Sequence, residues 1–191
     1  MPTQILRPNA AGDLTQFTHV IPGGTAHHLT VDETSADGET SMIRSQPEDA
    51  SGAWFIVIKE NSTTTAIEKT ATGTFANYTN EFTAKPSDSS AFTVTDINNL
   101  QIGVKFTGDD NPINQTDLFN IEDWPHNSGD TINSITVTAR WKSSGLSHFT
   151  FMDCTQIFAT VDYTEFVETT GPFKIEAGAN VKITSGKLTI K

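Results

Sequence analysis

Polar and apolar residues alternate in short segments along most of this chain, and threonine recurs in them throughout. About 30 of the 191 residues are Thr, a β-branched residue that suits the half-exposed face of a pleated sheet. Residues that favour exposed helices are scarce, and Gly, Pro, Asn or clustered Thr interrupt every stretch longer than about ten residues. These features exclude a helical bundle or a coiled coil and favour an all-β fold.

Three segments carry the clearest strand patterns. Residues 53–59 are almost continuously apolar, which predicts a strand buried on both faces or at the centre of a sandwich. Residues 100–107 and 131–141 alternate, which predicts half-exposed antiparallel strands. The side chains expected to face the core are Leu100, Ile102, Val104 and Phe106 in the first of these and Asn133, Ile135, Val137, Ala139 and Trp141 in the second.

Weaker patterns predict further short strands separated by Gly, Pro, Asn and Asp. They cover residues 4–7, 16–21, 27–31, 41–44, 73–82, 117–121, 148–152 and 155–163. A single helical turn capped by Thr95 is expected over residues 95–100. Strands that recur about every 8 to 12 residues indicate an antiparallel β-sandwich or jelly roll. We expect this domain to span residues 1–165, followed by a β-arm over 166–191.

The net charge restricts the partners of the protein. Twelve Lys and Arg against 23 Asp and Glu give a formal charge of −11, which argues against direct nucleic-acid binding. The first residues have neither the basic start nor the apolar core of a signal peptide, and no apolar run reaches the roughly 20 residues that membrane insertion needs. The one cysteine, Cys154, excludes an internal disulfide and is expected to be a small residue of a strand.

Charge is divided unevenly along the chain. Residues 171–191 contain four Lys and one Glu, a formal charge of +3, whereas residues 1–170 contain 8 basic and 22 acidic residues, a charge of −14. This pattern predicts that the arm of one subunit adds as strands to a sheet edge or acidic face of another. Its expected buried anchors are Phe173, Ile175, Val181, Ile183, Leu188 and Ile190. The alternative is a hairpin that folds back on its own domain.

Candidate catalytic residues are few. Glu122, Asp123 and His126 lie together around Trp124 and Pro125, as in a glycan-active site, but successive strand residues point to opposite faces, so an acidic loop is the favoured interpretation. No nucleophile elbow is present, and no enzyme activity or cofactor is expected. Trp124 lies in a predicted loop and is the best candidate for stacking on a glycan.

Metal sites have only weak candidates. Asp37, Asp109 and Asp110 could supply oxygen ligands to calcium, but their spacing does not match an EF-hand, and Asp also suits turns. The neighbours His27 and His28 fall on a predicted strand and would point apart, so they are not expected to share a metal ion. We therefore expect no metal.

Five short segments together resemble a group of phage and archaeal-virus structural proteins that are predicted jelly-roll virion components. They are residues 5–10 with 14–16, residues 31–33 with Thr40, residues 117–119 with Glu122, Asp123 and Pro125, residues 131–140, and residues 154–158 with 161–163. The order differs from the family pattern, because residues 53–112 here precede the 131–140 segment. The group carries no catalytic residues that could be assigned to this chain.

The resemblance implies a non-enzymatic capsid or capsid-decoration protein, made in the host cytoplasm and located in the virion. Its partners would be further copies of itself, as a homo-oligomer, or other capsid proteins. The alternative is a carbohydrate- or receptor-binding β-sandwich module of a virion tail or cell surface, which would take a glycan.

Overall fold

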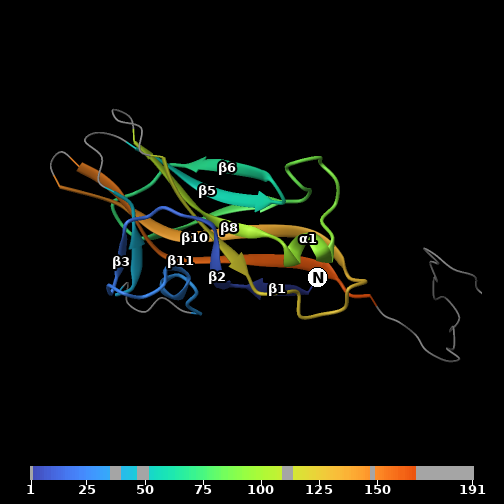
Figure 1. The fold of residues 1–191 in the computed structure, drawn as a ribbon. Coiled ribbons are helices and arrows are strands. Elements are labelled where there is room, and N and C mark those ends of the chain that lie inside the picture. The colour runs from blue at the N-terminus through green and yellow to red at the C-terminus, as the bar shows by residue number, and fades with distance from the viewer. Residues whose placement is uncertain (1, 35–39, 47–51, 109–113, 147–148, 167–191) are drawn as a thin grey trace, which may run out of the picture.

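Two antiparallel β-sheets packed face to face make up the protein (Figure 1). The computed structural model describes residues 2–34, 40–46, 52–108, 114–146 and 149–166. Within these ranges, helix is limited to the 3₁₀ turn η1 (His27–Thr30) and to α1 (Val94–Asn98). The prediction of an all-β antiparallel sandwich is thus confirmed. No helix in the described part has the length and hydropathy needed to cross a membrane.

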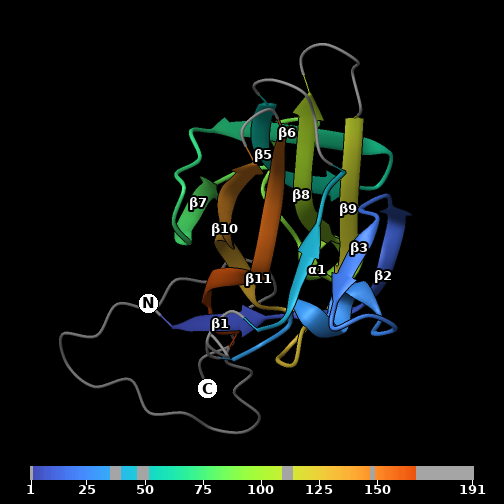
Figure 2. The same ribbon diagram turned by 90° about the vertical axis from the view of Figure 1, so that its left-hand side faces the viewer.

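The first sheet has six strands, in the order β3-β4-β11-β10-β7, with β1 also paired to β11. Their bounds are β1 (Thr3–Leu6), β3 (His19–Ile21), β4 (Met42–Arg44), β7 (Ala76–Phe82), β10 (Thr131–Leu146) and β11 (Phe149–Thr164). β10 and β11 form one long hairpin that runs the length of the molecule, and Figure 2 shows it beside β7.

The second sheet has five strands, in the order β2-β9-β8-β5-β6. Their bounds are β2 (Pro8–Thr15), β5 (Gly52–Glu60), β6 (Thr63–Lys69), β8 (Gln101–Gly108) and β9 (Asn114–Ile121). Every pair of neighbours in this sheet is antiparallel. The edge strands of the sheet are β2 and β6.

Side chains from the two facing sheets form one core. The inward residues predicted in the segment 100–107 are all buried, and so are four of the five predicted for β10. Asn133 is the exception, because a register shift between Ile132 and Ser134 interrupts the alternation there and leaves Ile132 buried instead. In β5, Ile56, Val57 and Ile58 are fully buried in succession, as the continuous apolar run predicts.

Several local predictions were wrong. The strand predicted over 27–31 is instead η1 (His27–Thr30), in which the Thr30 hydroxyl donates to the His27 carbonyl and the Leu29 N–H to the Ala26 carbonyl. The helical turn α1 begins earlier than expected, because Thr93 and Asp96 form a reciprocal capping box. The separate strands predicted over 148–152 and 155–163 are one strand, β11. β2 and β6 were not predicted.

Candidate functional site

Most of the predicted site residues lie outside the part of the chain that the structure describes. This holds for the arm anchors Phe173, Ile175, Val181, Ile183, Leu188 and Ile190 and for the calcium candidates Asp37, Asp109 and Asp110. Among the described residues, no group of three or more His, Cys, Asp or Glu is arranged to hold a metal ion.

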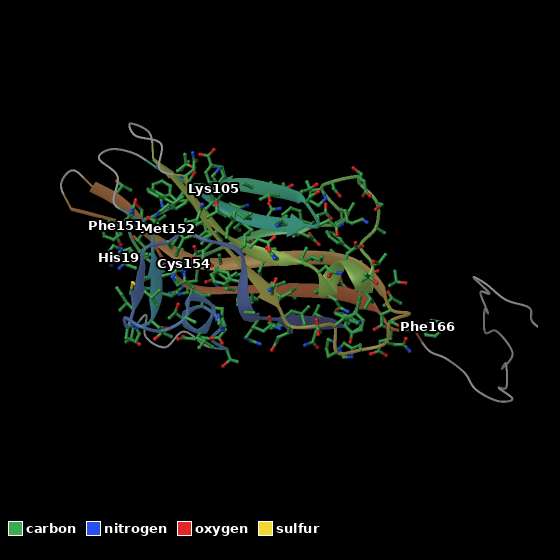
Figure 3. The ribbon with its side chains drawn as sticks, in the orientation of Figure 1. His19, Lys105, Phe151, Met152, Cys154 and Phe166 are labelled. Carbon is green, nitrogen blue, oxygen red and sulfur yellow. The ribbon has the colours of Figure 1, made fainter. Side chains whose placement is uncertain are left out.

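Trp124 is buried, which corrects the expectation of an exposed glycan-stacking residue. Its indole Nε1 donates a hydrogen bond to Asp130 Oδ2 at 3.1 Å, and its ring packs edge-on against Tyr163, with ring centroids 4.9 Å apart. Asp130 also accepts a hydrogen bond from the backbone N–H of Phe166 at 2.7 Å. Trp124 and Asp130 therefore anchor the chain where it leaves β11, at the opposite end of the sandwich from Phe151 (Figure 3).

Glu122 holds the backbone at the point where the chain passes from one sheet to the other. Only Arg7 separates β1 from β2, and these strands belong to different sheets. The Arg7 N–H donates to Glu122 Oε2 at 3.1 Å, and the Glu122 N–H donates to the Arg7 carbonyl at 2.9 Å. Glu122 thus has a structural contact with Arg7, and the neighbouring Asp123 is exposed.

The neighbouring histidines have different surroundings, because His27 contacts a buried carboxylate whereas Nδ1 of His28 is buried without a hydrogen-bond partner in the described structure. His27 Nδ1 lies 2.5 Å from Oδ2 of Asp117, a fully buried carboxylate on β9. The other oxygen, Oδ1, accepts hydrogen bonds from the backbone N–H groups of Gln16 and Phe17 at 2.6 and 2.8 Å. This cluster ties η1 and the segment between β2 and β3 to the second sheet.

Cys154 lies in a strand, β11, as expected; it is also fully buried, and burial raises the pKa of its thiol. Thiol reagents attack the thiolate, so both burial and the raised pKa protect this side chain. We expect a thiol reagent to label Cys154 in native buffer at least about a thousandfold more slowly than in guanidinium chloride, because labelling requires unfolding. The rate is measured by mass spectrometry. Comparable rates in the two solvents would contradict the burial of Cys154.

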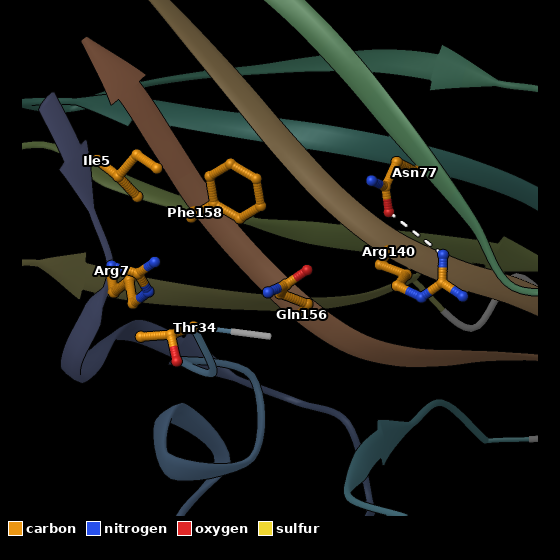
Figure 4. A pocket seen from close by; sticks show the side chains of 7 residues that line it. All are labelled: Ile5, Arg7, Thr34, Asn77, Arg140, Gln156 and Phe158. Carbon is orange, nitrogen blue, oxygen red and sulfur yellow. Dashed lines mark hydrogen bonds between the residues drawn. The ribbon is translucent and has the colours of Figure 1, made fainter. Parts of the chain in front are cut away.

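A pocket of about 310 Å³ lies on the face of the first sheet that points away from the core (Figure 4). Four strands of that sheet or their ends supply its lining, together with one loop residue. The lining residues are Ile5, Arg7, Thr34, Asn77, Arg140, Gln156 and Phe158. None of these lining residues is acidic, although the whole chain carries a formal charge of −11.

A bulge in the long hairpin shapes the pocket. Arg140 pairs with Gln156, whereas the next residue, Trp141, pairs with Cys154, so Thr155 is an additional residue in β11. A bulge of this kind bends its strand and changes the direction in which nearby side chains point. Arg140 Nη1 also donates to Asn77 Oδ1 at 3.4 Å, and the Gln156 amide donates to the Glu33 carbonyl at 2.7 Å. Both polar side chains are thereby held at the pocket wall.

The sequence prediction missed every residue of this pocket as a site residue. One signal was available, because Arg7 and Arg140 are two of only eight basic residues in positions 1–170. Nothing local in the sequence indicates that they lie at one site, since Arg7 is between two short strands and Arg140 is in the middle of β10.

Comparison of the chain with protein-family models, curated proteins and solved structures finds no match. The fold and the pocket therefore define the class of the protein on their own. It is an antiparallel β-sandwich with a small basic pocket on the outer face of one sheet.

Proposed function

We propose that this protein is a non-enzymatic structural subunit of a virus particle, a capsid or capsid-decoration component with jelly-roll architecture. It acts through subunit–subunit contacts in a homo-oligomer or with other capsid proteins. The resemblance of five sequence segments to phage and archaeal-virus structural proteins supports this proposal. The division of charge between an acidic body and a lysine-rich C-terminal segment also supports it.

The observation that carries the proposal is the unprotected edge of the second sheet. In the described part of the chain, the backbone of β6 pairs with β5 alone, which leaves its outer backbone groups available to another strand. Edge strands are commonly protected by Pro, by central Lys residues or by bulges. β6 has no Pro or register shift, and its one Lys is at its end. Strand addition at this edge would satisfy both backbones.

Deleting residues 171–191 should lower the number of subunits in the assembly measured by multi-angle light scattering, because the lysine-rich segment proposed to bind the neighbouring subunit is lost. If the number of subunits, obtained by dividing the assembly mass by the subunit mass, were the same before and after the deletion, this would contradict the proposal. A full-length control with Gln in place of Lys174, Lys182, Lys187 and Lys191 separates charge from strand pairing. Its assembly should weaken, and its remaining assembly should depend less on salt.

Ala66 offers a test of the edge itself, since its side chain is exposed in the middle of β6. Ala66→Lys should weaken assembly by repelling the lysine-rich segment, whereas the matched variant Ala66→Glu should preserve or strengthen it. Equal effects of the two variants on the assembly mass would indicate that the arm does not bind at β6.

A second candidate function is a carbohydrate- or receptor-binding module of a virion tail or cell surface. The observation that favours it is the pocket around Arg7 and Phe158. Trp124, which the sequence suggested for this role, is buried. The pocket volume of about 310 Å³ falls at the lower end of the range for small-molecule sites.

A further inference from the structure

We propose that the pocket on the first sheet binds a sugar acid, meaning a hydroxylated ring that carries one carboxylate. The proposal rests on the second candidate function and adds the chemical class of the ligand. Figure 4 shows Phe158 and Gln156 between Arg7 on one side of the pocket and Arg140 on the other.

Arg7 provides the first part of the argument. Its Nε is buried and has no hydrogen-bond partner within the described part of the chain. Buried N–H groups almost always have an acceptor, and a guanidinium suits the two oxygens of a carboxylate. The two backbone hydrogen bonds with Glu122 fix the position of Arg7 at the sheet crossing. Because Nε is not accessible to solvent in this arrangement, a ligand carboxylate would reach it only after the Arg7 side chain turns towards the pocket, while the backbone stays in place.

The second part is the neutral surface beside Arg7. Phe158 is half-buried, and Ile5 is 39% exposed, so both present apolar surface to the pocket. An aromatic ring suits the apolar C–H face of a sugar ring. Asn77, Gln156 and Thr34 lie around this surface and carry the amide and hydroxyl groups that bind sugar hydroxyls.

Gln156 is positioned to form a hydrogen bond with a sugar hydroxyl. Its Nε2 donates to the carbonyl of Glu33, so the amide orientation is held and Oε1 remains available to accept from a ligand hydroxyl. Arg140 is held beside it by Asn77. Preorganised polar groups of this kind reduce the ordering cost of binding a small polar ligand.

The charge of the whole protein limits the charge of the ligand. Residues 1–170 carry a formal charge of −14, which repels polyanions such as nucleic acid at long range. Among the described residues that line the pocket there are two arginines and no Asp or Glu. A small ligand with one negative charge gains the local attraction and experiences less of the long-range repulsion than a polyanion does.

The test is a titration of the full-length protein with glucuronate and with its neutral counterpart, glucose, followed by amide chemical shifts. Glucuronate should bind with a Kd on the order of 1 mM, and glucose at least about tenfold more weakly. Arg7→Ala should weaken glucuronate binding by at least about tenfold. Arg7→Lys should weaken it by less, because Lys keeps the positive charge but lacks the planar pair of N–H donors that binds both carboxylate oxygens. Lys105→Ala removes one positive charge from the other sheet and should leave binding unchanged.

Three results would overturn the proposal. Inorganic phosphate binding as tightly as glucuronate, with the same loss in Arg7→Ala, would indicate an oxyanion site with no selectivity for a sugar. If glucose and glucuronate bind equally well and Phe158→Ala abolishes both, the carbohydrate-binding function is supported and the proposed selectivity for a carboxylate is refuted. If neither sugar binds, the sugar-acid proposal fails, and a glycan array that also shows no binding would reject the carbohydrate-binding function.

Discussion

Replacing Gly103 with Ala should lower the free energy of unfolding by about 3 kcal/mol or more, the upper end of the range for overpacked cores. Gly103 lies in β8, and a Cβ there would come within 1.9 Å of the Asp117 carbonyl oxygen on β9. Because this contact is with backbone, no side-chain rotation can relieve it, and β8 and β9 would have to separate locally. Chemical denaturation followed by far-UV circular dichroism measures the loss.

Gly73→Ala is the matched control. A Cβ at Gly73 would meet nothing within 4 Å in the described structure, so this variant should change the free energy of unfolding by less than about 0.5 kcal/mol. A Gly103→Ala protein as stable as Gly73→Ala would show that β8 and β9 do not approach as closely as described.

Asp117→Ala should cost about 3 to 5 kcal/mol of stability, which is a large part of the total for a domain of ordinary stability. The substitution removes the acceptor of three close contacts, with the Gln16 N–H, the Phe17 N–H and His27 Nδ1. Phe17 is buried, so its N–H loses its acceptor in a place with little access to water. The midpoint of urea unfolding measures the change.

Two further variants make the result specific. Asp117→Asn keeps one oxygen in place to accept from Gln16 and Phe17 and should cost less than half as much as Asp117→Ala. Asp123→Ala removes an exposed carboxylate close to the end of β9 and should have an effect within about 0.5 kcal/mol. If Asp117→Ala and Asp123→Ala unfold at the same urea concentration, the buried cluster contributes no stability.

Strand patterns were predictable wherever one side of a segment is apolar. The alternation in residues 131–141 and the continuous apolar run in residues 53–59 both correspond to strands in the structure. β6 was missed because none of its residues is fully buried and three of the seven are Thr, so the segment has little apolar contrast. β2 was missed because Pro8 and Gly12 are typical of turns, although Pro is tolerated as the first residue of a strand.

The environment of individual polar and aromatic residues was less predictable. Trp124 follows two acidic residues and precedes Pro125, a context typical of an exposed loop. It is buried because Asp130 accepts from its indole and Tyr163, far along the chain, packs against its ring. A carboxylate such as Glu122 can act as an acid or a base, but in this structure it accepts a hydrogen bond from the backbone N–H of Arg7.

By itself, the sequence determined the class of fold, because β-branched residues, short alternation and frequent turn residues act locally along the chain. It also determined the division of charge between the body and the last 21 residues. Only the tertiary structure decided which strands are neighbours, where bulges shift the alternation, and that Arg7 and Arg140 line one pocket. The physical reason is that strand pairing joins residues distant in sequence, so a site built across four strands leaves no contiguous pattern.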